Sequence, residues 1–128
     1  MHGDGHASRD WLYVGDDAEA VEATIEAPIE TVAGEVINIG TCIDSPVSEI
    51  ARLVLDALGK PRDRVTHMNE RPGQVDRHIG STDKAKELLG WEARTSFAEG
   101  LERTVAWYRE NESWWRGILA REVRAFSS

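Results

Sequence analysis

The chain has 128 residues, of which 41% are hydrophobic and 30% charged, as in one ordinary globular domain. Its formal net charge of −8 argues against a nucleic-acid-binding surface, because phosphate backbones attract basic faces. No run approaches the roughly 18 apolar residues of a membrane span, and the polar residues 1–6 do not read as a signal peptide, so neither is expected. The single cysteine, Cys42, excludes an internal disulfide and favours a reducing, cytoplasmic location.

The first quarter of the chain predicts a loop, a strand and a helix. Residues 1–8 are polar and glycine-rich, which is typical of a loop, and the apolar run 11–14 predicts a strand. Asp16 is a capping residue for a helix over about residues 17–27, which Pro28 ends. The apolar positions of this helix recur at helical spacing: Ala18, Val21 and Ile25.

The middle of the chain predicts two more strands around a second helix. Residues 36–39 form a compact β-branched run, followed by a loop over residues 40–44. Ser45-Pro46 is a favourable helix start, and Gly59 is a typical helix end. An apolar stripe lies between them: Ile50, Leu53, Val54, Ala57 and Leu58. Residues 64–68 predict the third short strand.

The last half of the chain predicts a long loop and then helices. The loop covers residues 69–80, and a short helix over residues 82–89 ends at a glycine. Ser96 and Glu99 fit a capping box at the start of the next helix, and residues 113–125 form the last helix. Three short strands and five helices predict a small α/β domain, with few strands for a sheet that must bury two faces.

Two arginines in the long loop are candidates for binding phosphate. Proline and glycine shape the segment Arg71-Pro72-Gly73-Gln74-Val75-Asp76-Arg77, so both guanidinium groups can converge on one diphosphate. The alternative is a solvated loop in which these arginines pair with Asp76 and Glu70.

Two further polar residues stand where a ligand could be bound. Arg9 lies at a loop-to-strand junction, and Asp10 beside it is placed to orient it. The alternative is a surface ion pair, worth ~0–1 kcal/mol. Asn38 interrupts an apolar strand, so it either fixes the adjacent loop backbone or reaches a ribose or phosphate. The four histidines lack the spacing of a zinc motif, so no metal site is predicted.

The order and spacing of these segments resemble the C-terminal, substrate-binding part of the NAD-dependent epimerase/dehydratase family, the extended short-chain dehydrogenases. The resemblance runs from about residue 1 to residue 115. The matching segments are Gly3-Asp4-Gly5, Arg9-Asp10-Trp11-x-Tyr13-Val14-x-Asp16, Asn38-Ile39-Gly40, Ser45-Pro46-Val47-Ser48-Glu49-Ile50, Arg71-Pro72-Gly73 with Arg77, Asp83-Lys84-Ala85, Leu89-Gly90-Trp91, Ser96-Phe97-x-Glu99-Gly100-Leu101 and Thr104-Val105. The segment Trp107-Tyr108-x-x-Asn111-x-x-Trp114-Trp115 is most similar to dTDP-glucose 4,6-dehydratases.

This resemblance implies a substrate site and a domain organisation. Arg9 and Arg71 would contact the diphosphate or ribose of a sugar nucleotide, and Asn38 would lie in the same pocket. Gln74 stands where related dehydratases often carry histidine, and Arg77 would support the loop or the ligand. Residues 1–128 would form a single partial domain without the N-terminal Rossmann domain, and residues 116–128 an extra C-terminal helix.

The family's catalytic and cofactor motifs are not found in this sequence. It has no Gly-x-x-Gly-x-x-Gly fingerprint, and the fourth residue after each tyrosine is Asp17 or Glu112 instead of the lysine of a Tyr-x-x-x-Lys pair. We therefore assign no catalytic, cofactor-binding or metal-binding residue, and expect NAD only in an intact family enzyme.

The resemblance implies the nucleotide-diphosphate-sugar-binding part of an NAD-dependent sugar-nucleotide 4,6-dehydratase or epimerase, a lyase in the dehydratase branch, which is not catalytically competent alone. The alternatives are a stand-alone sugar-nucleotide-binding module and an oligomerisation module. In each case we expect a homo-oligomer or pairing with a Rossmann half, because the Trp114-Trp115 region and the surface left bare by the missing half would drive association. The five tryptophans either stack on a base or pack between helices and cover apolar surface that a partner meets.

Overall fold

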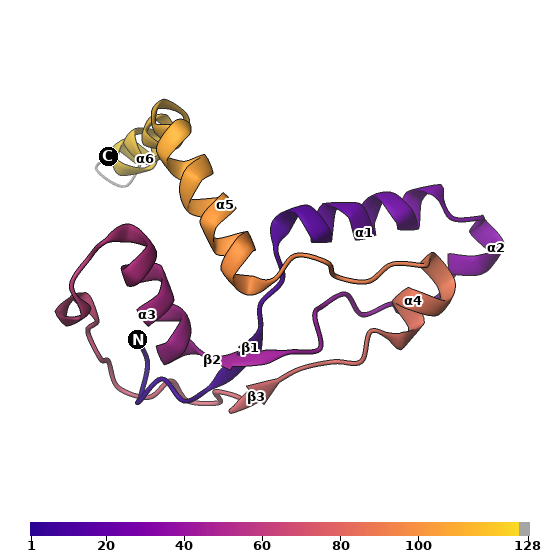
Figure 1. Cartoon of the computed structure of the whole chain (residues 1–128), viewed down its shortest axis with the longest axis horizontal. Helices are drawn as coiled ribbons and strands as arrows, with labels where there is room; N and C mark the ends of the chain where they lie inside the picture. The colour runs from indigo at the N-terminus through magenta and orange to yellow at the C-terminus, as the bar shows by residue number, and fades with distance from the viewer. Residues whose placement is uncertain (126–128) are drawn as a thin grey trace.

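The computed structural model describes residues 1–125, with side-chain surroundings to residue 120. In chain order the elements are β1 (Ser8–Asp10), α1 (Val14–Glu26), α2 (Ile29–Val32), β2 (Asp44–Pro46), α3 (Val47–Leu58), the 3₁₀ turn η1 (Arg62–Arg64), β3 (Arg77–His78), α4 (Asp83–Leu89), α5 (Phe97–Glu110) and α6 (Glu112–Ala125). Figure 1 shows the small sheet between α3 on one side and the α1 and α4 region on the other. The α/β class is confirmed, and the additional α helix in the described part is the short α2.

The three strands form one sheet in the order β2-β1-β3. Central strand β1 runs antiparallel to β2, with Arg9 opposite Ser45, and parallel to β3, with Arg9 opposite His78. Because side chains alternate between the two faces of a strand, Ser8 and Asp10 share one face and Arg9 lies on the other. The sheet therefore separates the polar residues of β1 into two groups.

The positions predicted for the strands were wrong, although their number was right. The apolar runs at residues 11–14, 36–39 and 64–68 are not ladder strands, apart from one isolated bridge between His2 and Met68. Leu12, Ile37 and Ile39 instead pack their side chains against the buried core. High β-propensity shows that the side chains of a segment suit a half-buried surface, but it does not show that the backbone has a strand to pair with. It therefore indicated segments that pack on the core instead of the segments that form the sheet.

The helix ends follow local sequence signals more closely. Gly59 and Gly90 end α3 and α4 in the left-handed conformation, with φ of 63° and 65°. The Ser96 hydroxyl accepts the Glu99 N–H at 3.3 Å, as the capping box predicts. Two predicted caps were wrong, because α1 begins before Asp16 and Ser45 lies in β2.

The core is small and lies between α1 and α4. Ala20, Ala85 and Trp91 form its buried cluster, and the Trp91 indole N–H donates to the Asp16 carbonyl at 3.1 Å. The predicted last helix corresponds to α6, and residues 126–128 of the predicted extra helix lie outside the described residues. No helix in the described part of the chain is both long and apolar enough to cross a bilayer.

Candidate functional site

The long loop before β3 lies along the N-terminal segment. The Gly3 N–H donates to the Met68 carbonyl at 2.9 Å, and the Met68 N–H donates to the Met1 carbonyl at 2.8 Å. Further along, the Ser8 N–H donates to the Asp76 carbonyl at 2.7 Å. These backbone bonds fix the arginine-bearing loop next to the start of β1, although the two segments are about 65 residues apart in sequence.

A cavity of about 520 Å³ lies between these two segments. Arg71 and Gln74 line it, at the two ends of a turn in which the Gln74 N–H donates to the Arg71 carbonyl at 3.1 Å. Gly73 has a φ of 76° in that turn, a conformation that glycine adopts without strain. The other lining residues are His2, Gly3, Asp4, His6, Ala7, Glu70, Pro72, Gly73 and Asp76.

Arg71 is exposed at this cavity, and no ion pair within the described residues involves its guanidinium. The pairing of Arg71 with Glu70 or Asp76, which the solvated-loop alternative requires, is therefore not formed. A guanidinium that forms no ion pair is available to bind an anionic ligand, in a cavity that the carboxylates of Asp4, Glu70 and Asp76 also line.

Arg77 has a different environment. Its Nε and Nη2 donate to the two carboxylate oxygens of Asp44 at 3.0 and 2.8 Å, and the Ser8 hydroxyl donates to the same carboxylate at 2.6 Å. The hydrogen bonds from Arg77 and then Ser8 hold the pKa of Asp44 well below its usual range. Arg77 does not line the cavity, and its charge is balanced by Asp44, so its role as a ligand residue stays a prediction.

Arg9 lies on the opposite face of the sheet from this pair. It is half-buried, is flanked in register by Ser45 and His78, and donates from Nη1 to the Ser8 carbonyl at 2.6 Å. It does not line the cavity of Arg71. The structure thus separates the three arginines, and their convergence on one ligand stays a prediction.

Asn38 lies on an exposed, extended segment, and its Nδ2 donates to the Ser81 carbonyl at 3.3 Å. This contact matches the interpretation in which the amide fixes a neighbouring backbone. Its Oδ1 accepts no hydrogen bond from the described residues, so the amide keeps an acceptor for a ligand hydroxyl.

Sequence reasoning gave Asp10 the wrong partner. Its carboxylate does not orient Arg9 but accepts the Thr41 N–H, the Thr41 hydroxyl and the Cys42 N–H, at 2.6 to 3.0 Å. Asp44 was missed as the partner of Arg77. No local pattern identifies either contact, because the paired residues are more than 30 positions apart.

The described residues do not fit a dinucleotide cofactor. Such a cofactor needs a glycine-rich turn between a strand and a helix, where the pyrophosphate meets free backbone N–H groups. The turn between β1 and α1 contains Trp11, Leu12 and Tyr13, and α3 follows β2 directly after Pro46. The connection from β3 to α4, residues 79–82, contains a single glycine, Gly80. None of the three junctions is a glycine-rich turn.

The fold is that of the C-terminal portion of enzymes in the NAD-dependent epimerase/dehydratase family. The family model described as GDP-mannose 4,6 dehydratase matches residues 1–104, and this chain belongs to that family.

Within the family, the similarity extends to dTDP-glucose 4,6-dehydratases. The enzyme of that name from Streptomyces niveus is 37% identical over 118 residues, which cover 92% of this chain and 34% of the relative. A dTDP-glucose 4,6-dehydratase from Bacillus anthracis, solved in complex with NAD, superposes with a TM-score of 0.74 at 30% identity, covering 91% of this chain and 36% of that one.

The chain is also similar to epimerases of the same family. The UDP-glucose 4-epimerase of Thermotoga maritima, solved with UDP-glucose, has a TM-score of 0.77 at 34% identity and covers 87% of this chain and 34% of its own. The chain thus spans about a third of the length of the relatives it matches.

Proposed function

We propose that this chain is the nucleotide-diphosphate-sugar-binding part of an NAD-dependent sugar-nucleotide 4,6-dehydratase or epimerase, and that it has no catalytic activity alone. Membership of the family and the similarity to a structure solved with UDP-glucose support this proposal. In the intact enzyme, the sugar would be oxidised at C4 by NAD before water is eliminated or a centre is inverted, and this chain would supply only binding.

The observation that carries the proposal is the cavity beside Arg71. It offers an exposed guanidinium that forms no ion pair within the described residues, on a turn fixed by backbone hydrogen bonds, in a volume of about 520 Å³ that Asp4, Glu70 and Asp76 also line. Volumes of about 300–1,000 Å³ are typical of small-molecule sites. Arg71 would bind the diphosphate, and Gln74 would donate or accept a hydrogen bond beside it.

Arg9 and Asn38 lie outside this cavity, so they would contact the ligand only where it extends beyond the cavity. Arg9 would add a second positive charge, and the free Oδ1 of Asn38 would accept a hydrogen bond from a ribose hydroxyl. Arg77 would act indirectly, because its ion pair with Asp44 links β3 to β2 across the central strand β1, next to the binding loop.

Calorimetric titration of the purified chain with dTDP-glucose, UDP-glucose and NAD tests this proposal. We expect sugar-nucleotide binding without NAD binding, and a loss of at least tenfold in affinity in Arg71→Ala, since removing one charged hydrogen-bonding partner costs about 1.5–3 kcal/mol. Arg64→Ala is the matched control, because this exposed arginine does not line the cavity. Equal affinity of the two variants, or binding of NAD alone, would contradict the proposal.

A further inference from the structure

A single isolated β-bridge joins the two walls of the Arg71 cavity at its upstream end. His2 pairs with Met68 in a parallel bridge, in which the Met68 carbonyl accepts the Gly3 N–H and the Met68 N–H donates to the Met1 carbonyl. The bridge does not continue into a ladder strand. The Gly3 carbonyl, which would accept the next hydrogen bond of a parallel ladder, therefore needs a different donor.

Two histidine side chains provide donors beside this bridge. His67 Nδ1 lies 2.8 Å from the Gly3 carbonyl oxygen, and His2 Nδ1 lies 3.1 Å from the Asn69 carbonyl oxygen. Because a carbonyl oxygen only accepts, Nδ1 carries the proton in both rings and donates. One histidine belongs to each wall, so the two hydrogen bonds cross the gap in opposite directions. Residues 1–3 and 67–69 are therefore held together by side chains as well as by backbone.

The conformation of Gly3 brings the N-terminal wall close to the binding turn. Its φ is 56°, and a Cβ at this position would lie 3.1 Å from the Glu70 Cγ. Glycine permits both the conformation and the close approach. The residue whose carbonyl accepts from His67 thus lies against Glu70, which directly precedes Arg71 in the chain.

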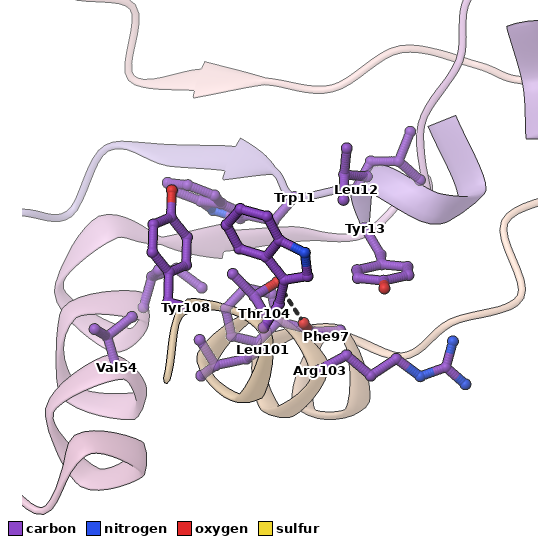
Figure 2. A pocket seen from close by; sticks show the side chains of 13 residues that line it. Trp11, Leu12, Tyr13, Val54, Phe97, Leu101, Arg103, Thr104 and Tyr108 are labelled. Atoms are coloured by element: carbon purple, nitrogen blue, oxygen red, sulfur yellow. Dashed lines mark hydrogen bonds between the residues drawn. The ribbon is translucent and has the colours of Figure 1, made fainter. Parts of the chain in front are cut away.

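Figure 2 shows a cavity whose walls are held in a different way. It is an apolar groove of about 600 Å³, in which the Trp11–Tyr13 segment meets side chains of α3 and α5. Two of its walls are helices, whose backbone hydrogen bonds are internal. The walls of the Arg71 cavity, residues 2–7 and 70–76, contain neither a helix nor a ladder strand. The shape of the Arg71 cavity therefore depends on a few contacts between its walls.

We propose that His67 is a positioning residue of the candidate site: its hydrogen bond to the Gly3 carbonyl holds the Arg71 turn in place for a diphosphate. His67 precedes Arg71 by four residues and does not line the cavity, so it acts through the turn. The downstream end of the turn is held separately, by the Ser8 N–H bond to the Asp76 carbonyl. Without the upstream contact, a ligand would have to order the turn as it binds, which lowers affinity. This inference rests on the proposed function.

Two substitutions at His67 distinguish its donor from its ring. His67→Phe keeps a flat ring without the N–H, whereas His67→Asn keeps an N–H donor on an atom bonded to Cγ, as Nδ1 is. In calorimetric titration with dTDP-glucose and UDP-glucose, we expect the affinity of His67→Phe to fall about fivefold, the scale of one neutral hydrogen bond. The affinity of His67→Asn should return to within about twofold of the wild-type chain.

The matched control is His78→Phe. It makes the same change at an exposed histidine whose imidazole has no hydrogen bond to the part of the chain that the structure describes, so it should keep wild-type affinity. Circular dichroism of each purified variant verifies folding. Unchanged affinity in His67→Phe, an equal loss in His78→Phe, or a loss in His67→Asn as large as that in His67→Phe would overturn the inference.

Hydrogen exchange of the ligand-free chain separates this inference from the proposed function. In His67→Phe the Gly3 and Met68 amides should exchange about fivefold faster, while the Thr95 amide keeps its wild-type rate. This pattern in a chain that binds no sugar nucleotide would keep the contact between the walls and remove the proposed function. Sugar-nucleotide binding that His67→Phe leaves intact would keep the proposed function and remove the positioning role.

Discussion

Asp10 and Asp16 lie six residues apart and use the same hydrogen-bond pattern in two different regions. Asp10 accepts two backbone N–H groups and a threonine hydroxyl from Thr41 and Cys42. Asp16 accepts two backbone N–H groups and a threonine hydroxyl from Arg94 and Thr95. Each carboxylate therefore attaches a distant turn to the connection between β1 and α1.

Their surroundings differ. Asp16 is 5% exposed, and its own carbonyl accepts the Trp91 indole N–H, so it belongs to the small core. Asp10 is half-buried and holds the turn that follows Asn38, next to the candidate binding residues. The same contact thus stabilises the fold at one position and shapes the edge of a site at the other, and burial decides which.

The largest effect is expected at the buried carboxylate. Asp16→Ala removes a buried carboxylate and leaves three partly buried donors of residues 94–95 without an acceptor, so we expect a loss of about 3 kcal/mol in the free energy of unfolding. Urea denaturation measures it. Asp17→Ala, on the exposed side of the same turn, is the control and should change stability by less than about 0.5 kcal/mol. Similar losses in both variants would contradict a specific role for Asp16.

A smaller and more local effect is expected at Asp10. Asp10→Ala should lower the free energy of unfolding by about 2 kcal/mol. The loss is smaller because water can accept some of the hydrogen bonds that the half-buried carboxylate accepted. Hydrogen exchange should show the Thr41 and Cys42 amides losing protection while the Thr95 amide keeps it. A uniform loss of protection across all three amides would mean that Asp10 supports the whole fold and not one turn.

Gly40 offers a test of the Asp10 contact from the other side. A Cβ at Gly40 would lie 2.6 Å from Asp10 Oδ2, so Gly40→Ala should displace the carboxylate and cost about 1–2 kcal/mol. In the Asp10→Ala background that cost should fall by at least half, since the obstructing atom is gone. Denaturant melts of the four proteins complete the double-mutant cycle, and additive losses would exclude the coupling.

The smallest effect is in the pH dependence of stability. Burial of Asp16 favours its protonated form, but the hydrogen bonds from Thr95 and Arg94 outweigh burial and lower its pKa below the ordinary value of 3.8. Asp16 therefore contributes stability that is fully present above the pKa of the unfolded state and is lost as pH falls through the lower folded pKa. Urea melts below pH 4 should show a shallower loss in Asp16→Asn, and an unchanged slope would contradict this linkage.

The sequence predicted the helices better than the strands, for a physical reason. Helix ends depend on residues within one turn, as at Gly59, Gly90 and Ser96, and these signals can be read locally. The strands have two or three residues each and exist only through pairing between distant segments. Two of the apolar runs that resembled strands, residues 11–14 and 36–39, contribute side chains that pack on the core, whereas residues 64–68 are mostly exposed.

Of the candidate site residues, the sequence indicated the Arg71 turn, but it did not reveal how the other candidates are arranged around it. The Arg71 turn could be expected from its proline and glycine, and the structure places it at a cavity. The ion pair that balances Arg77 and the placement of Arg9 on the opposite face depend on β-sheet register. Register is set by pairing between segments that are distant in sequence, and the spacing of motifs does not reveal that pairing.

The position of the N-terminal segment has a consequence for synthesis on the ribosome. Several partners of its first sixteen residues come late: Met68 for Gly3, Asp76 for Ser8, His78 for Arg9 and Thr95 for Asp16. Because loop closure must precede these contacts, the emerging chain cannot complete its three-stranded sheet before residue 78 has left the ribosome exit tunnel, or the contacts of Asp16 with Trp91 and Thr95 before about residue 95 has left it. The apolar residues of α1 therefore remain accessible to chaperones until then.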